Sequence, residues 1–297
     1  ICQNTFSREM MRFQEMRLSS NGQELGGDLI FQRRLGFSGT PSDLLPVELG
    51  RCQYRKGDDG RMLHFLSCPS IMSVQALSVD WNVTKLLDLI AAGRYSALID
   101  TGALITGLTN EQVARYLLVN GLPNMRGVVF LDENDRKMIL VRAGMKVVRL
   151  DQCGIAMAER FSFYDQVHTT GMDIKQVVNA EAVLTLGKDM TFRDFAQGAF
   201  RMRGIGKGQK IVLYVVPEVW KLVSAQVSLG SGEPAEQRQQ RLAVIGGDAR
   251  TEQILKDVAG WLVLNSMRSE KMQWNLLCEQ SIANVWRKRA YRRLVRQ

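Results

Sequence analysis

Short apolar runs separated by polar turns fill the middle of the chain. The continuous runs are of the kind found in strands buried on both faces, and amphipathic segments alternate with them. This alternation predicts an α/β fold with a mainly parallel sheet and helices on both faces. The expected strands lie within "YSALID", "RGVVFLDEN", "RKMILVRAG", "KVVRLDQ", "RFSFYDQ", "AEAVLTLG" and "QKIVLYVVPEV".

Three segments before or between these runs have helical spacing. Residues 110–121 predict a helix with Asn110 as N-cap and Gly121 as terminator. "SVQALSVDWNVTKLLDLIAAG" has apolar residues at helical spacing and ends on Gly93, so residues 73–92 are expected to be helical. "TFRDFAQGAFRMRG" predicts a helix that opens at Thr191 and ends in glycines.

The two ends of the chain have a different pattern. Residues 1–36 predict a polar-rich helix followed by a strand, and "YRKGDDGRMLHFL" predicts a Gly-Asp loop or hairpin tip. No strand is expected beyond Glu218. "SLGSGEPAEQRQQR" has the composition of a linker, and residues 250–297 predict a helical extension.

Composition and charge narrow the class of protein. The chain has 297 residues, 45% hydrophobic and 23% charged, which is a globular composition with enough residues for a full core. The formal net charge of +9 favours polyanionic partners such as nucleic acid, nucleotide or acidic protein, without choosing among them.

The five cysteines are scattered, with no CxxC pair, which favours a reduced chain in the cytoplasm or nucleus. No apolar run reaches the ~18 residues of a membrane span, and no signal peptide is visible, so no membrane partner is expected. The chain begins with Ile1, which indicates a piece of a longer protein.

Three stretches share one possible chemistry. "FSGTP" ends a strand in Ser38, Gly39 and Thr40; "TTGMDIK" carries Thr170, Gly171 and Asp173 just after His168; "QGAFRMRG" carries Gln197, Arg201 and Arg203. A hydroxyl turn, a Gly-x-Asp loop and a Gln/Arg helix are the parts that sense a nucleoside triphosphate across a cleft. An Arg there neutralises charge on the transferred phosphoryl group.

In this order the three stretches resemble the third, fifth and sixth motifs of superfamily-2 helicases. Residues 30–220 also resemble a block in very large eukaryotic proteins that are catalogued as ubiquitinyl hydrolases. The resemblance implies three parts: residues 1–70 end a first RecA-like lobe, residues 71–222 form the second lobe, and residues 223–297 are a linker and basic helical extension. It also implies that catalysis rests on Arg201, Arg203, Gln197, His168 and Asp173. Ser38, Gly39, Thr40, Thr170 and Gly171 would contact the cofactor.

The chain departs from the helicase pattern in two ways. Arg203 follows Arg201 by two residues where the family has three, which on a helix turns the second guanidinium by about 100° and argues against a two-Arg grip. No GxxxxGK[ST] loop is present in the sequence. ATP and magnesium would therefore be shared with an upstream lobe, and this piece alone is not expected to hydrolyse ATP.

Other interpretations stay open. A deubiquitinase would need a thiol near His64 or His168, and Cys153 and Cys68 are the candidates for His168. Alternatively, His168 is a hydrogen-bonded turn residue, Asp173 a cap, and the glycines after Arg203 a helix exit. No metal site is expected. The chain would then be a non-catalytic module that binds RNA or an acidic protein, with the basic C-terminal tail as one contact surface. The resemblance to the ubiquitinyl hydrolases implies ubiquitin as a further partner.

Overall fold

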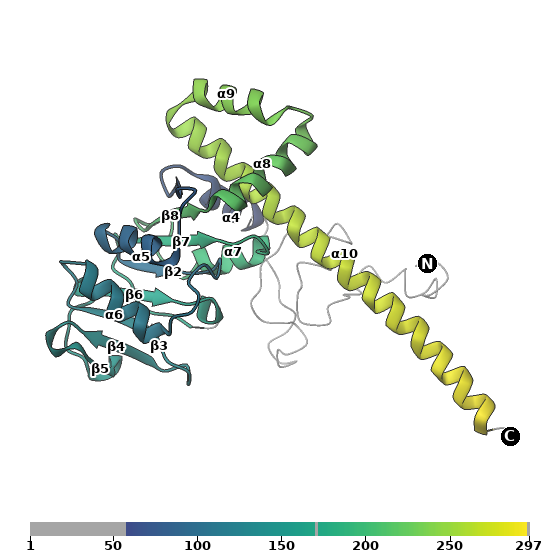
Figure 1. Ribbon diagram of the computed structural model, residues 1–297, viewed down its shortest axis with the longest axis horizontal. Helices are drawn as coiled ribbons and strands as arrows, with labels where there is room; N and C mark the ends of the chain where they lie inside the picture. The colour runs from purple at the N-terminus through teal and green to yellow at the C-terminus, as the bar shows by residue number, and fades with distance from the viewer. Residues whose placement is uncertain (1–57, 170–171, 296–297) are drawn as a thin grey trace. The chain divides into compact units, whose positions relative to one another are not determined.

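The computed structural model describes residues 58–169 and 172–295 (Figure 1). The chain divides into two units, and the larger one, Gly60–Val263, contains the whole β-sheet. The other unit combines Ile1–Asp59 with Leu264–Gln297, of which residues 58–59 and 264–295 are described. The candidate site lies entirely in the larger unit.

The described elements alternate between strands and helices. The strands are β1 (Met72–Ala76), β2 (Ala97–Ile99), β3 (Gly127–Leu131), β4 (Lys137–Val141), β5 (Lys146–Arg149), β6 (Arg160–Tyr164), β7 (Glu181–Leu186) and β8 (Lys210–Val215). The α-helices are α4 (Asp58–Ser67), α5 (Val83–Ala92), α6 (Asn110–Asn120), α7 (Phe192–Ala199), α8 (Pro217–Ser231), α9 (Ala235–Ile245) and α10 (Gly247–Val295).

All eight strands form one sheet in the order β1-β8-β7-β2-β6-β3-β4-β5. The first six strands in this order, β1 to β3, pair in parallel with their neighbours. At the other end of the sheet, β4 pairs antiparallel with both β3 and β5. The predicted α/β fold with a mainly parallel sheet is therefore confirmed. Each of the seven strands predicted between residues 95 and 218 forms, and "RKMILVRAG" is the hairpin partner of β3. The helix and strand predicted within residues 1–36 lie outside the described residues.

The direction of each crossover connection determines the face of the sheet on which its helix lies. The connections through α5 and α6 run toward the β5 end of the sheet, whereas those from β6 to β7 and from β7 to β8 run back. Because such crossovers are right-handed, α5 and α6 lie on one face, and α7 with residues 165–169 and 172–180 lies on the other. Figure 1 shows α5 and α6 side by side on their face, where they pack together.

The described part of the connection from β6 to β7 has no α-helix and contains only the 3₁₀ turn η6 (Val167–Thr169). A segment without helix or strand, residues 172–178, therefore lies where a crossover helix would cover the sheet. β3 is buried along its full length, but β4 and β5 are only partly buried. The sheet is thus less covered toward its β5 end, where a cleft opens.

Several local predictions are wrong. The N-cap of α6 is Thr109, which forms a capping box with Gln112, and Asn110 is the first helical residue. Residues 73–92 do not form one helix: Met72–Ala76 is an edge strand that pairs only with β8, and α5 begins at Val83 after the N-cap Asn82. "YRKGDDGRMLHFL" is not a loop over its described residues, since α4 occupies Asp58–Ser67 and buries Met62 and Leu66. Packing of these apolar side chains outweighs the turn propensity of the Gly-Asp sequence.

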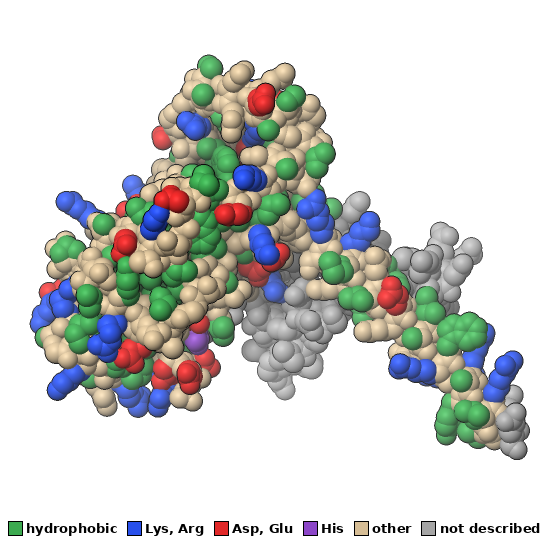
Figure 2. Space-filling model, viewed as in Figure 1, with side chains coloured by type: hydrophobic (Ala, Val, Ile, Leu, Met, Phe, Trp, Pro, Cys, Tyr) green, Lys and Arg blue, Asp and Glu red, His purple; other side chains and the backbone are tan. Residues whose placement is uncertain are grey.

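The C-terminal prediction holds in outline. α10 runs unbroken over residues 247–295, which confirms the helical extension. The linker is shorter than expected, because α8 extends to Ser231 and α9 begins at Ala235. Residue 222 falls inside α8, and the domain boundaries at 70 and 222 stay predictions. Figure 2 shows Lys and Arg side chains alternating with hydrophobic ones on the last part of α10.

Candidate functional site

Asp173 joins the two helicase-like stretches in one ion cluster. Its carboxylate accepts hydrogen bonds from Arg201 Nη1 at 3.0 Å and from Arg203, whose Nε and Nη2 bind both oxygens at 2.8–3.2 Å. Arg201 and Arg203 lie 28 and 30 residues after Asp173 in the sequence. The segment 172–174 and the turn after α7 are therefore brought together, as the predicted grouping of Asp173, Arg201 and Arg203 requires.

The two arginines do not lie on a helix. α7 opens with a capping box between Thr191 and Asp194, as its predicted start required, but it ends at Ala199. Arg201 and Arg203 follow in a series of turns, in which the Arg201 amide donates to Gly198 O. The expected rotation of about 100° between the guanidinia does not apply, because the turn directs both toward Asp173. The premise of the argument against a two-Arg grip, a helix that continues through both arginines, is thus wrong.

The two arginines differ in exposure. Only 8% of the Arg201 side chain is exposed, and its donors also reach Met172 O and Gln197 O. Burial lowers the pKa of Arg201, which Asp173 partly offsets. The Arg203 side chain is 61% exposed, so an incoming anion can reach its guanidinium. Arg201 is therefore suited to holding residues 172–173 in place, whereas Arg203 is suited to binding a ligand.

Two further side chains fix residues 172–178 in place. The Tyr164 hydroxyl at the end of β6 accepts from Ile174 N at 2.7 Å and donates to Ile174 O at 3.3 Å. Burial raises the pKa of Tyr164 to about 12, so this hydroxyl stays a donor. Gln209 accepts from Gly204 N at 2.7 Å and donates to Val177 O at 2.8 Å. The sequence analysis did not single out either residue, although Tyr164 lies in the predicted strand "RFSFYDQ" and Gln209 begins the predicted strand "QKIVLYVVPEV".

His168 belongs to a second cluster. Its Nδ1 contacts Asp165, and its Nε2 lies 2.9 Å from the carboxylate of Asp135 in the β3–β4 turn. Burial lowers its pKa, but the two carboxylates together raise the pKa above its ordinary value. With both ring nitrogens occupied, His168 ties two loops together, in line with the turn-residue interpretation.

The remaining predicted residues fall into two groups. Gln197 is buried in α7, one turn before Arg201, and its carbonyl oxygen accepts from Arg201 Nε at 3.4 Å. Ser38, Gly39, Thr40, Thr170 and Gly171 lie outside the described residues, so their predicted cofactor contacts stay predictions.

The carboxyl ends of β2 and β6 lie side by side, as the parallel sheet predicts. Asp100 follows β2, and its amide donates to Tyr164 O in β6 at 2.8 Å. Its buried carboxylate accepts from Leu104 N, Ile105 N and Thr185 Oγ1 at 2.6–3.0 Å. Burial raises the pKa of Asp100. The carboxylate closes the turn after β2 and is already satisfied there.

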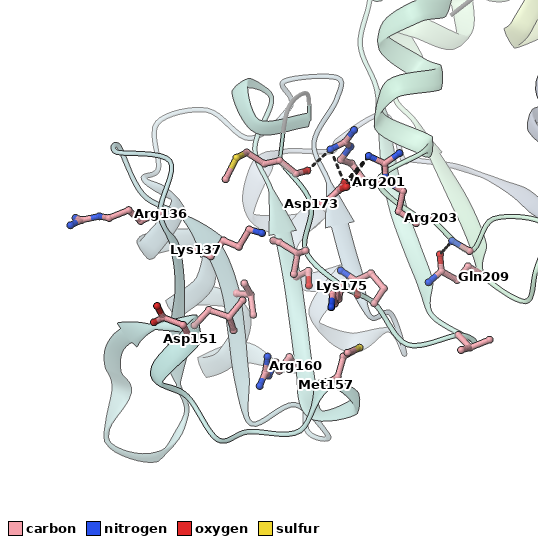
Figure 3. Close-up of a pocket in the computed structure, with 18 of the residues that line it drawn as sticks. Arg136, Lys137, Asp151, Met157, Arg160, Asp173, Lys175, Arg201, Arg203 and Gln209 are labelled. Atoms are coloured by element: carbon pink, nitrogen blue, oxygen red, sulfur yellow. Dashed lines mark hydrogen bonds and ion pairs between the residues drawn. The ribbon is translucent and has the colours of Figure 1, made fainter. Parts of the chain in front are cut away.

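A basic cleft of about 1280 Å³ opens beside the Asp173 cluster (Figure 3). Its described lining contains eight Lys or Arg and three Asp. The β4–β5 hairpin and the turn after β5 form one wall, and residues 172–178 with the turn after Arg203 form the other. No sequence pattern predicts this cleft, because its lysines lie in three separate stretches of the chain.

Among the described residues, no group of three or more His, Cys, Asp or Glu side chains is placed to hold a metal ion. Cys68 Sγ lies 3.1 Å from Ser70 Oγ, while His64 packs against Phe65. In the described part of the chain, no helix is both long and apolar enough for a membrane span. In comparisons with protein families, curated proteins and solved structures, nothing matches this chain.

Proposed function

We propose that residues 71–222 act as the second lobe of a helicase-type NTPase. The single observation that supports this is the Asp173 cluster: two stretches that resemble helicase motifs meet in one charged group. The mainly parallel α/β sheet fits such a lobe but does not single it out.

In this proposal the arginines have separate roles. Arg203, exposed at the surface, meets the phosphates of a nucleotide and neutralises charge that develops during phosphoryl transfer. Arg201, nearly buried, holds residues 172–173 in place. Asp173 orients both guanidinia.

ATP and magnesium come from elsewhere in this scheme. The sequence lacks a GxxxxGK[ST] loop, so another lobe of the parent protein supplies the phosphate and metal contacts. His168 takes no part in the chemistry, because both its ring nitrogens bind carboxylates. For the same reason we do not extend the proposal to a thiol peptidase that uses His168.

ATP hydrolysis by the full parent protein tests the proposal. Arg203→Ala should lower the rate by about 10³-fold, the effect typical of an arginine that contacts the transferred phosphoryl group. Arg203→Lys should retain part of the rate, since charge remains without the forked geometry. Lys188→Ala, an exposed position between β7 and α7, is the matched control.

Either of two results would refute the proposal: a parent protein that hydrolyses no ATP, or an Arg203→Ala variant with the rate of the control. Thermal unfolding of each variant separates loss of function from loss of fold.

A second candidate function is a binding module for an acidic partner. The basic cleft favours it, independently of any nucleotide chemistry.

A further inference from the structure

The basic cleft has more positive charge than its own acids neutralise. Asp173 is shared by Arg201 and Arg203, Asp151 pairs with Arg149, and Asp135 binds His168. Three lining lysines, Lys137, Lys175 and Lys207, have no ion-pair partner among the described residues. All three are exposed.

The lysines come from different walls. Lys137 opens β4, whereas Lys175 lies in the segment 172–178 and Lys207 in the turn before β8. Figure 3 shows Lys137 reaching from β4 toward the segment that carries Lys175, while Arg136 points away from it. An anionic chain between the walls would therefore meet ammonium groups on both sides.

Apolar side chains lie between the charges. Val129, Met157, Met172, Ile174 and Val178 all line the cleft. Methionine side chains adapt to irregular partners because they are unbranched and polarisable. The lining therefore suits a ligand that carries apolar groups as well as negative charges.

The size and composition of the cleft discriminate between ligand classes. At about 1280 Å³ it exceeds the roughly 300–1,000 Å³ of small-molecule sites, so it suits a segment of a polymer. Sites for single-stranded nucleic acid use aromatic side chains on which bases stack. None of the described lining residues is aromatic.

We propose that this cleft binds an extended peptide segment of another protein in which acidic residues alternate with apolar ones. The carboxylates pair with Lys137, Lys175 and Lys207, and the apolar side chains pack on the methionines. This inference does not rest on the proposed NTPase function.

Fluorescence anisotropy with the full 297-residue chain tests it. The probe is a labelled peptide of about twelve residues in which Glu alternates with Leu, the extended form in which peptides enter grooves. Comparison probes are the same peptide with Lys in place of Glu, and a labelled single-stranded RNA of similar length. The variants are Lys137→Glu, Lys175→Glu and both together, with Lys188→Glu as the matched exposed control.

Each single reversal should weaken peptide binding by about fivefold and the double reversal by at least about twentyfold, because exposed charge pairs contribute about 1 kcal/mol each. Added salt should weaken binding by screening. Equal affinity of the double variant and Lys188→Glu would overturn the proposal. So would equally tight binding of the Lys peptide, or tighter binding of the RNA.

Discussion

Two ion clusters lie in and beside the connection from β6 to β7, and they differ in what they leave exposed. The first centres on His168, 10% exposed, whose two ring nitrogens are taken by Asp165 and Asp135. The second centres on Asp173, which holds one nearly buried arginine and one that is 61% exposed. Both contain residues that the sequence marks as catalytic.

This difference in exposure distinguishes side chains that stabilise the fold from side chains that can bind a ligand. A side chain whose polar groups are all satisfied inside the fold stabilises the loops that it joins, and it has nothing left for a ligand. A forked guanidinium at the surface can exchange its carboxylate for a phosphate, which has similar geometry. Arg203 meets this condition, whereas His168 and Arg201 do not.

The largest effect on folding is expected within the Asp173 cluster. Arg201→Ala should lower the free energy of unfolding by about 2 kcal/mol, because it removes a nearly buried guanidinium together with its hydrogen bonds to Met172 O and Asp173. Arg203→Ala should cost less than about 1 kcal/mol, since its ion pair is exposed. Urea unfolding of both variants measures the difference. Equal losses would show that the two arginines do not have separate roles.

The His168 cluster should depend on pH. The pKa of His168 is raised above its ordinary 6.5, so its protonated form stabilises the fold below pH 6.5. This stabilisation is lost as the pH rises through the folded-state pKa. His168→Gln should therefore lower the free energy of unfolding by about 1 kcal/mol near pH 6, and by less at higher pH. A loss that is independent of pH would contradict the assigned ion pairs.

The smallest effect concerns an acid that belongs to both the His168 cluster and the cleft. Asp135 is 73% exposed and lines the cleft, so Asp135→Asn should change stability by less than about 1 kcal/mol. Removing its charge should tighten binding of the acidic peptide by about twofold. Fluorescence anisotropy with that peptide measures the change in affinity. Weaker binding by Asp135→Asn would contradict a peptide site in this cleft.

Local sequence patterns predicted most of the sheet, because its central strands are continuous apolar runs. They failed at β1, where an edge strand forms through pairing with β8, more than 130 residues away. They also failed at α4, where Met62 and Leu66 pack into the core despite a Gly-Asp sequence. Long-range pairing and packing are not visible in a short window.

The candidate site was predictable only in part. The grouping of Asp173 with the two arginines followed from motif order, but their geometry did not, since it depends on α7 ending at Ala199. The second ring nitrogen of His168 has a partner because Asp135, 33 residues away in the sequence, lies beside it in another turn. The cleft depends on a crossover without a helix, which no single residue indicates.

ATP hydrolysis by the parent protein, compared between Arg203→Ala and His168→Gln, tests the central distinction most directly. We predict a loss of about 10³-fold for Arg203→Ala and a change of less than about threefold for His168→Gln, provided both variants are folded. Equal losses in the two variants, or a wild-type rate in Arg203→Ala, would contradict the account.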